Sequence, residues 1–273
     1  MELTFSKMHG LGNDFVVVDW PVGQPQPDPA LVRAWADRGT GVGFDQLLTV
    51  TVPSLNAADA DYRVYNADGG EVEQCGNGAR CIVRFLAERN GREQVRLHSP
   101  AGLVEGAVVG DRVRINLGVP SFEPADLPFV GQSQAERYQL QVDDGVVEFG
   151  AVSVGNPHIV VAVDSVERAP VGILGAKLEV HPAFPQRTNV GFMQVVDRDT
   201  IRLRVFERGV GETRACGTGA IAAVAVASLW QQVAEQVQVE LPGGWLEVNW
   251  QGPGQPLWLS GPATKVFEGT LKL

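Results

Sequence analysis

Short runs of β-branched and aliphatic residues recur along the whole chain, whereas helical patterns are few. Such runs, bounded by glycine, proline and asparagine, are typical of β-strands. They cover Phe15–Val18, Leu47–Val52, Val95–Leu97, Val113–Leu117, Ile159–Val163, Ile201–Val205 and Val237–Leu241. The pattern predicts a protein built mainly from sheets.

Two segments have a helical pattern. Ala79–Arg89 carries apolar residues on one face, and the following Asn90-Gly91 suits a helix C-terminus. Ala220–Trp230 is apolar almost all round, which predicts a buried helix. The proline-rich stretch Trp20–Ala30 is predicted to be a surface loop.

The chain contains an internal repeat. From Arg63 it reads RVYNADGGEVEQCGNGA, and from Arg204 it reads RVFERGVGETRACGTGA, an offset of 141 residues without a gap. Two further blocks recur in the same order: Gly12–Asp19 resembles Gly155–Asp164, and Val42-Gly-Phe-x-Gln46 recurs as Val190-Gly-Phe-x-Gln194. Glycine-rich turns shared by unrelated α/β proteins would explain one block, but not three in order. We therefore expect two homologous halves that face each other.

The expected fold class is α+β, with two pseudo-symmetric halves. Each half is a mostly antiparallel sheet or barrel wrapped on a central helix. Glycine and proline interrupt the strand pattern at Gly118–Pro124, which indicates a boundary there. The predicted domains are residues 1–118, which carry Cys75, and residues 119–263, which carry Cys216, with the active site in the cleft between them.

Composition narrows the function. Apolar residues make up 44% and charged residues 20%, as in ordinary globular enzymes, while the net charge is −10. Nucleic acid and anionic membranes require a basic face, so neither is expected as a partner. Met1–Trp20 does not have the pattern of a signal peptide, and the longest apolar stretch is too short to cross a bilayer. A cytoplasmic location is predicted.

The chain has three cysteines, too few for a disulfide scaffold. Cys75 and Cys81 lie too far apart in sequence for a zinc-binding CxxC pair, so we expect no metal site. Cys75 and Cys216 each begin a Cys-Gly-x-Gly-Ala motif directly before a predicted helix. Free N–H groups and the helix dipole favour an anion there, which predicts a lowered thiol pKa.

Two such thiols on opposite sides of a cleft could invert a stereocentre. A thiolate would remove a proton from one face and a thiol would deliver one to the other, without redox change. The glycines would let backbone N–H groups bind a carboxylate. Cys81, inside the first helix, is interpreted as a packed hydrophobe. His158 suits either a buried structural histidine or the site, and Glu207-Arg208 either an exposed ion pair or the site. Glu207 and Arg208 interrupt an otherwise strand-like run, which favours a place in the site for this pair.

Several motifs together resemble the diaminopimelate epimerases from end to end. They are Met8-His-Gly-Leu-Gly-Asn-Asp-Phe15, Gly43-Phe-Asp-Gln46, Asn66-Ala-Asp-Gly69, Gln74-Cys-Gly-Asn-Gly-Ala-Arg-Cys81, Gly155-Asn-Pro-His158, Arg187-Thr-Asn-Val-Gly-Phe192, Glu207–Ala220 and Leu259-Ser-Gly-Pro-Ala263.

The resemblance implies an isomerase that interconverts L,L- and meso-diaminopimelate for lysine and peptidoglycan synthesis. It implies no pyridoxal phosphate or other cofactor. It further implies that Cys75 and Cys216 are the acid–base pair, that His158 supports catalysis, and that Glu207 and Arg208 contact the amino and carboxylate groups of the substrate. The carboxylate cradles would be Gly76-Asn77 and Gly217-Thr218. The remaining substrate ligands would be Asn13, Gln46, Asn66, Asn156 and Asn189. A homodimer is expected, with residues 264–273 returning to the first half.

Other functions remain open on sequence grounds. Another two-cysteine racemase of the same fold, such as a proline racemase, would share the Cys-Gly-x-Gly elements but not the asparagine-rich set. Phenazine-type isomerases share the fold and lack the cysteine pair. A thiol-redox or binding protein could use Cys75 and Cys216 as a disulfide switch.

Overall fold

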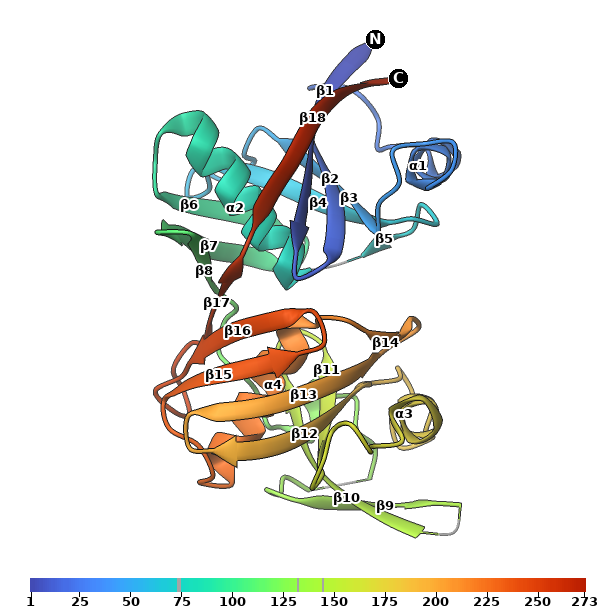
Figure 1. Cartoon of the computed structure of the whole chain (residues 1–273), viewed down its shortest axis with the longest axis vertical. Coiled ribbons are helices and arrows are strands. Elements are labelled where there is room, and N and C mark those ends of the chain that lie inside the picture. Colours follow the sequence, from blue (N-terminus) through green and yellow to red (C-terminus); the bar gives the residue numbers. More distant parts are fainter. Residues whose placement is uncertain (73–74, 132, 144) are drawn as a thin grey trace. The chain divides into compact units, whose positions relative to one another are not determined.

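The chain forms two compact units in the computed structural model, which describes residues 1–72, 75–131, 133–143 and 145–273. One unit comprises Met1–Asn116 together with Ser260–Leu273, and the other is the continuous segment Leu117–Leu259. The sequence predicts that the first segment ends at residue 118, two residues after Asn116. It predicts that the chain returns to the first unit at residue 264, whereas the structure has this return at Ser260. Figure 1 shows the elements of each unit.

The first unit contains most of its strands before residue 117 and one at the C-terminus. Its elements are β1 (Glu2–Gly10), β2 (Asn13–Asp19), α1 (Pro29–Ala36), β3 (Gln46–Thr51), β4 (Ala60–Asn66), β5 (Glu71–Val72), α2 (Gly76–Asn90), β6 (Gln94–Ser99), β7 (Gly102–Val109), β8 (Arg112–Asn116) and β18 (Thr264–Lys272). Strand β18 pairs antiparallel with β1, and the two strands lie side by side (Figure 1).

The second unit repeats this order. Its elements are a short 3₁₀ turn (Pro124–Asp126), β9 (Tyr138–Val142), β10 (Gly145–Ser153), β11 (Pro157–Ala162), α3 (Val171–Glu179), β12 (Asn189–Asp197), β13 (Thr200–Glu207), β14 (Gly211–Thr213), α4 (Gly217–Leu229), β15 (Gln236–Leu241) and β16 (Gly244–Asn249). Strand β17 (Trp258–Pro262) spans the boundary between the units.

The pairing pattern confirms the predicted internal repeat. In the first unit β2 pairs parallel with β3, and β3, β4 and β5 pair antiparallel in turn. In the second unit β11, β12, β13 and β14 pair in the same senses. The parallel pairs β4–β6 and β13–β15 also correspond, as do the antiparallel hairpins β6–β7 and β15–β16. The fold is therefore α+β with two similar halves.

Each unit surrounds one central helix. Helix α2 packs against β1, β2 and β3 as well as β6, β7 and β8, and α4 packs against β10–β13 and β16. The predicted burial of the second helix is confirmed, because every residue from Ala220 to Ala227 is buried. The predicted end of the first helix is also confirmed, since Gly91 has the left-handed conformation (φ 64°) and its N–H bonds the Ala87 carbonyl.

The prediction that Trp20–Ala30 is a surface loop is wrong at both ends. Trp20 is buried, and its ring N–H donates to the Pro25 carbonyl. Helix α1 begins at Pro29, because Asp28 caps it by accepting the Ala30 N–H at 2.7 Å and proline suits the first helical turn. Val32 and Trp35 then pack into the hydrophobic core beside β2 and β3. Helix α3, which no sequence pattern indicated, occupies the corresponding place in the second unit.

The structure also corrects one block of the repeat. Val42–Asp45 precedes β3, which begins at Gln46, whereas Val190–Gln194 lies inside β12, so the two blocks are not equivalent. The ladder pairs Phe15 with Gln46 in one unit and His158 with Asn189 in the other, an offset of 143 residues on both strands. Gln46 therefore corresponds to Asn189. The shared residues Val-Gly-Phe gave a wrong alignment, because the two halves retain the same strand positions here and not the same residues.

Two glycines let the sheets approach the central helices closely. A Cβ at Gly106 of β7 would overlap Val83 of α2, and one at Gly150 of β10 would overlap Val226 of α4. Both helix residues are fully buried, so they have little room to move.

We expect Gly150→Ala to lower the free energy of unfolding by about 1–3 kcal/mol, because the added methyl overpacks the helix contact. Gly145→Ala, on the same strand but with open space around the added Cβ, is the matched control and should cost nothing. Urea titrations of the purified variants measure both. Equal stabilities would show that α4 does not constrain β10 in this way.

Candidate active site

Both cysteines of the duplicated motif cap the central helix of their unit. Cys75 precedes α2 and Cys216 precedes α4, each in extended backbone conformation. The Gly78 N–H donates to Cys75 Sγ at 3.4 Å, and the Gly219 N–H donates to Cys216 Sγ at 3.3 Å. A side-chain acceptor at this position satisfies one of the free N–H groups of the first helical turn. The fold therefore fixes each sulfur at a positive helix end.

Polar side chains from β2 and α2 surround Cys75. Asn13 Oδ1 lies 3.9 Å from Cys75 Sγ and 3.4 Å from Asn77 Nδ2. Arg80, one turn into α2 and fully buried, donates to Asn77 Oδ1 at 2.7 Å. Burial lowers the pKa of Arg80 to about 10, so the guanidinium is still charged at neutral pH. A permanent cation therefore lies beneath the Asn77 amide.

Two further predicted residues meet at the ends of neighbouring strands. Gln46 and Asn66 are opposite each other in the β3–β4 ladder, and Gln46 Nε2 donates to Asn66 Oδ1 at 2.9 Å. Gln46 Oε1 is buried and has no hydrogen-bond partner among the described residues. A buried amide oxygen of this kind is costly unless something donates to it. Its unfilled acceptor position suits a ligand N–H.

Cys216 lies in a drier and more negative environment. It is 4% exposed, and Thr218 Oγ1 lies 3.5 Å from its Sγ. Burial and the charge of Glu207 raise the pKa of Cys216 well above its ordinary value, although Thr218 and the Gly219 N–H act in the opposite direction. The predicted lowering of the thiol pKa is thus wrong for Cys216. The helix end is present, but burial and a neighbouring carboxylate outweigh it.

Glu207 is held beside Cys216 by the hairpin β13–β14. Thr213 Oγ1 donates to Glu207 Oε1, and burial raises the pKa of this carboxyl. A bidentate pair between Arg204 and Glu212, at 2.7 and 2.9 Å, ties the two strands together. The interpretation of Glu207-Arg208 as an ion pair with each other is not supported, since Arg208 Nη1 instead donates to the Gln186 carbonyl at 3.3 Å.

His158 joins two asparagines in the second unit. Its Nε2 lies 3.0 Å from Asn156 Oδ1 and 3.4 Å from Asn189 Nδ2, while its Nδ1 is buried and has no hydrogen-bond partner in the described part of the chain. Asn189 also donates to the Pro157 carbonyl at 2.9 Å and accepts the Arg208 backbone N–H at 2.9 Å. Burial, followed by the charge of Arg208, lowers the pKa of His158 to about 3, so the ring is neutral.

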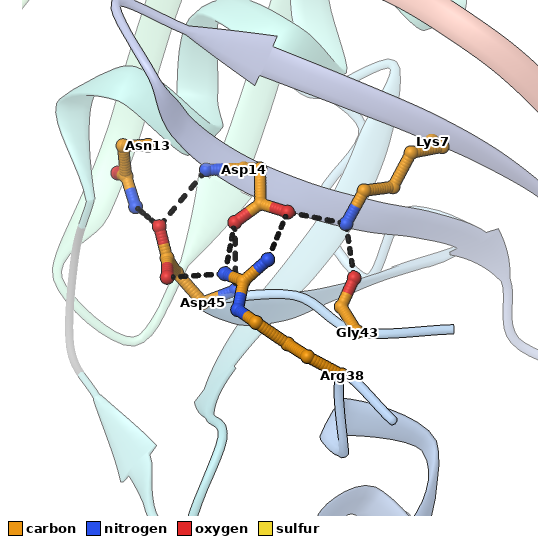
Figure 2. Close-up of polar contacts among 6 residues, drawn as sticks. All are labelled: Lys7, Asn13, Asp14, Arg38, Gly43 and Asp45. Atoms are coloured by element: carbon orange, nitrogen blue, oxygen red, sulfur yellow. Dashed lines mark hydrogen bonds and ion pairs between the residues drawn. The ribbon is translucent and has the colours of Figure 1, made fainter. Parts of the chain in front are cut away.

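The predicted residues thus form two sets at corresponding positions. The ladder registers match Asn13 with Asn156 and Gln46 with Asn189, and the repeat matches Cys75 with Cys216. Asn66 and Glu207 also correspond, one neutral and one acidic. Sequence reasoning missed several supporting residues: Arg80, Thr213, and the charged group Lys7, Asp14, Arg38 and Asp45 (Figure 2). Asp14 and Asp45 lie inside two of the motifs that carried the family resemblance, and this was the signal that could have identified them.

Within the described part of the chain, no three histidine, cysteine or carboxylate side chains are grouped in a way that could hold a metal ion. None of the described helices is both long and apolar enough to cross a membrane.

The sequence model for diaminopimelate epimerase matches residues 5–123 and 150–266. The chain belongs to the diaminopimelate epimerase family. The diaminopimelate epimerase of Stutzerimonas stutzeri strain A1501 is 51% identical over 276 aligned positions, covering all of both chains.

More distant solved structures share the fold of this epimerase family member. A hydroxyproline epimerase from Agrobacterium vitis has a TM-score of 0.71 at 18% identity, covering 99% of this chain and 92% of that one. A phenazine biosynthesis protein from Bacillus anthracis has a TM-score of 0.69 at 16% identity, with full coverage of both.

His158 predicts a pH dependence of stability. An unfolded histidine has a pKa near 6.5 and His158 in the folded chain about 3, so between these values only the unfolded chain binds the proton. The free energy of unfolding should therefore fall as pH drops below about 6.5, by roughly 1 kcal/mol per pH unit. His158→Gln should flatten this slope between pH 6.5 and 5, whereas His181→Gln should not. Parallel curves for wild type and His158→Gln would contradict a buried neutral imidazole.

Proposed function

We propose that the chain interconverts L,L- and meso-diaminopimelate by moving the α-proton between Cys75 and Cys216, with no cofactor. The observation that carries the proposal is the cysteine cap repeated at the central helix of both units. Its support is the end-to-end likeness to diaminopimelate epimerases. The product would serve lysine and peptidoglycan precursor synthesis.

The reaction needs only one proton and two sulfurs. One thiolate takes the α-proton from one face of the carbon, and the opposite thiol gives its own proton to the other face. The carbon ends inverted, the sulfurs have exchanged protonation states, and no electron is gained or lost. Free N–H groups at Gly76-Asn77 and Gly217-Thr218 would bind the α-carboxylate and stabilise the charge that develops on it.

In the proposed mechanism the two sulfurs begin with different charges. The raised pKa of Cys216 keeps this thiol protonated at neutral pH, which suits the proton donor of the resting enzyme. Cys75 would then be the resting base, beside the buried cation of Arg80. After one turnover the roles are reversed, so the return reaction begins from the opposite state.

The other end of the substrate would be read by neutral amides and by the pair Glu207 and Arg208. Diaminopimelate has an amino acid group at each end, so the site must bind the distal group without reacting with it. Directional hydrogen bonds from Asn13, Gln46, Asn66, Asn156 and Asn189 suit this task, and His158 would orient the last two. Analogues lacking a distal group should be rejected strongly, by about 10⁴-fold.

We also propose a cytoplasmic homodimer, on the strength of the family resemblance.

Replacing either capping cysteine should abolish epimerisation. We expect Cys75→Ala and Cys216→Ala each to lower kcat by at least about 10²-fold, the contribution of a lost acid or base. Cys81→Ala is the matched control, because Cys81 is fully buried inside α2 and burial raises its pKa to about 12. Activity and incorporation of solvent deuterium into both stereoisomers are measured without added pyridoxal phosphate or metal. Loss of activity with a chelator and recovery with zinc would overturn the proposal.

The two cysteines should also be stereochemically distinct. A β-fluoro analogue loses fluoride once its α-proton is removed, so elimination requires only the base on the correct face. Cys75→Ser and Cys216→Ser should therefore prefer opposite diastereomers of such an analogue. Fluoride release from both diastereomers gives the preference directly. If both variants favoured the same diastereomer at similar rates, two bases on opposite faces would have to be abandoned.

A further inference from the structure

Two neighbouring carboxylates, Asp14 and Asp45, lie where β2 and β3 begin, and the proposed reaction does not use them. Each accepts the backbone N–H of the other, at 3.1 and 3.2 Å. Arg38 Nη2 lies 2.7 Å from Asp14 Oδ1 and 2.8 Å from Asp45 Oδ1, and Lys7 Nζ donates to Asp14 Oδ2 (Figure 2). Two cations therefore balance two anions that would otherwise repel each other.

The Asp14 carboxylate is charged at neutral pH. Burial alone would raise the pKa of Asp14, but hydrogen bonds from Arg38 and Lys7 lower it to about 2. Lys7 is itself 8% exposed and also donates to the Gly43 carbonyl. This arrangement holds Asp45 in place, with its Oδ2 facing Asn13.

Asn13 connects this charged group to the cysteine. Its Nδ2 donates to Asp45 Oδ2 at 3.0 Å, so its Oδ1 faces Asn77 Nδ2 and Cys75 Sγ. At the other end Arg80 fixes the Asn77 amide by donating to its oxygen. If the Asn13 amide turned over, its oxygen would face a carboxylate and its NH₂ would face another NH₂. A charged acceptor at one end and a charged donor at the other thus set the direction of both amides.

The second unit has no such group at the corresponding positions. The offset of 143 residues places Pro157 and Thr188 where Asp14 and Asp45 stand. There the oxygen of Asn156 contacts His158 Nε2 instead. The carboxylate therefore acts on the Cys75 side alone.

We propose that Asp45 is a positioning residue for proton transfer at Cys75, acting through the amide of Asn13. The inference rests on the proposed epimerase reaction. It states that Asp45, held by Arg38 and Asp14, keeps the oxygen of Asn13 where it accepts the S–H of Cys75 once the sulfur has taken up the α-proton. The second unit positions its own asparagine without a carboxylate, so the effect belongs to one face of the substrate.

The test is Asp45→Asn, which keeps the shape of the side chain. One carboxylate oxygen becomes an NH₂ and the negative charge is lost, so the acceptor that faces Asn13 is either replaced by a donor or weakened to a neutral amide oxygen. In both cases the direction of the Asn13 amide is less firmly fixed. We expect kcat for fluoride elimination to fall about tenfold for the diastereomer that Cys216→Ser still processes. Elimination from the other diastereomer should be unchanged, which also shows that the variant is folded.

Asp19→Asn is the matched control. Asp19 ends β2, the strand on which Asn13 lies, also pairs with an arginine, Arg89, and does not contact Asn13. It should leave both diastereomers at wild-type rates. Equal losses for both diastereomers in Asp45→Asn, or no loss for either, would overturn the inference. If wild-type protein neither epimerised diaminopimelate nor released fluoride, the proposed function itself would fail.

Discussion

The hydrogen bond from a glycine N–H to a cysteine sulfur, at the start of each central helix, is the contact on which the site depends. A helix end buried in a sheet must satisfy its free N–H groups, and serine, threonine, aspartate or asparagine usually does so. Here a thiol takes that place in both units. Each sulfur is therefore located by backbone geometry, and the sheet that wraps each helix fixes where it lies.

The two units share a backbone plan but differ in charge. Around Cys75 the buried cation of Arg80 and a balanced group of two cations and two carboxylates support the asparagines. Around Cys216 the support comes from a carboxyl, a hydroxyl and a neutral imidazole. The proposed exchange of one proton between two sulfurs needs one to begin charged and the other neutral. Matching backbones with different charges meet that requirement.

Much of the fold and of the candidate site could be predicted from the sequence, because key residues of the repeat have specific local roles, such as starting or ending a helix. Cysteine before glycine marked both helix starts, and Asn90-Gly91 marked a helix end. The pKa of Cys216 could not be predicted, since it depends on Glu207 and on burial, which only the folded chain provides. The same holds for Arg80, whose neighbours come from distant strands. Helix α1 was missed because the prolines before it dominated the local pattern, although Asp28-Pro29 is a recognisable start.

The pairing of β18 with β1 has a consequence for synthesis on the ribosome. The second unit is one continuous segment, so all its strands are available once residue 259 has emerged. In the first unit β2 pairs with one edge of β1, but the other edge has no partner until residues 264–272 follow. The half whose first residues are made earliest is thus completed last, and until then the edge of β1 stays open to pairing with other nascent chains.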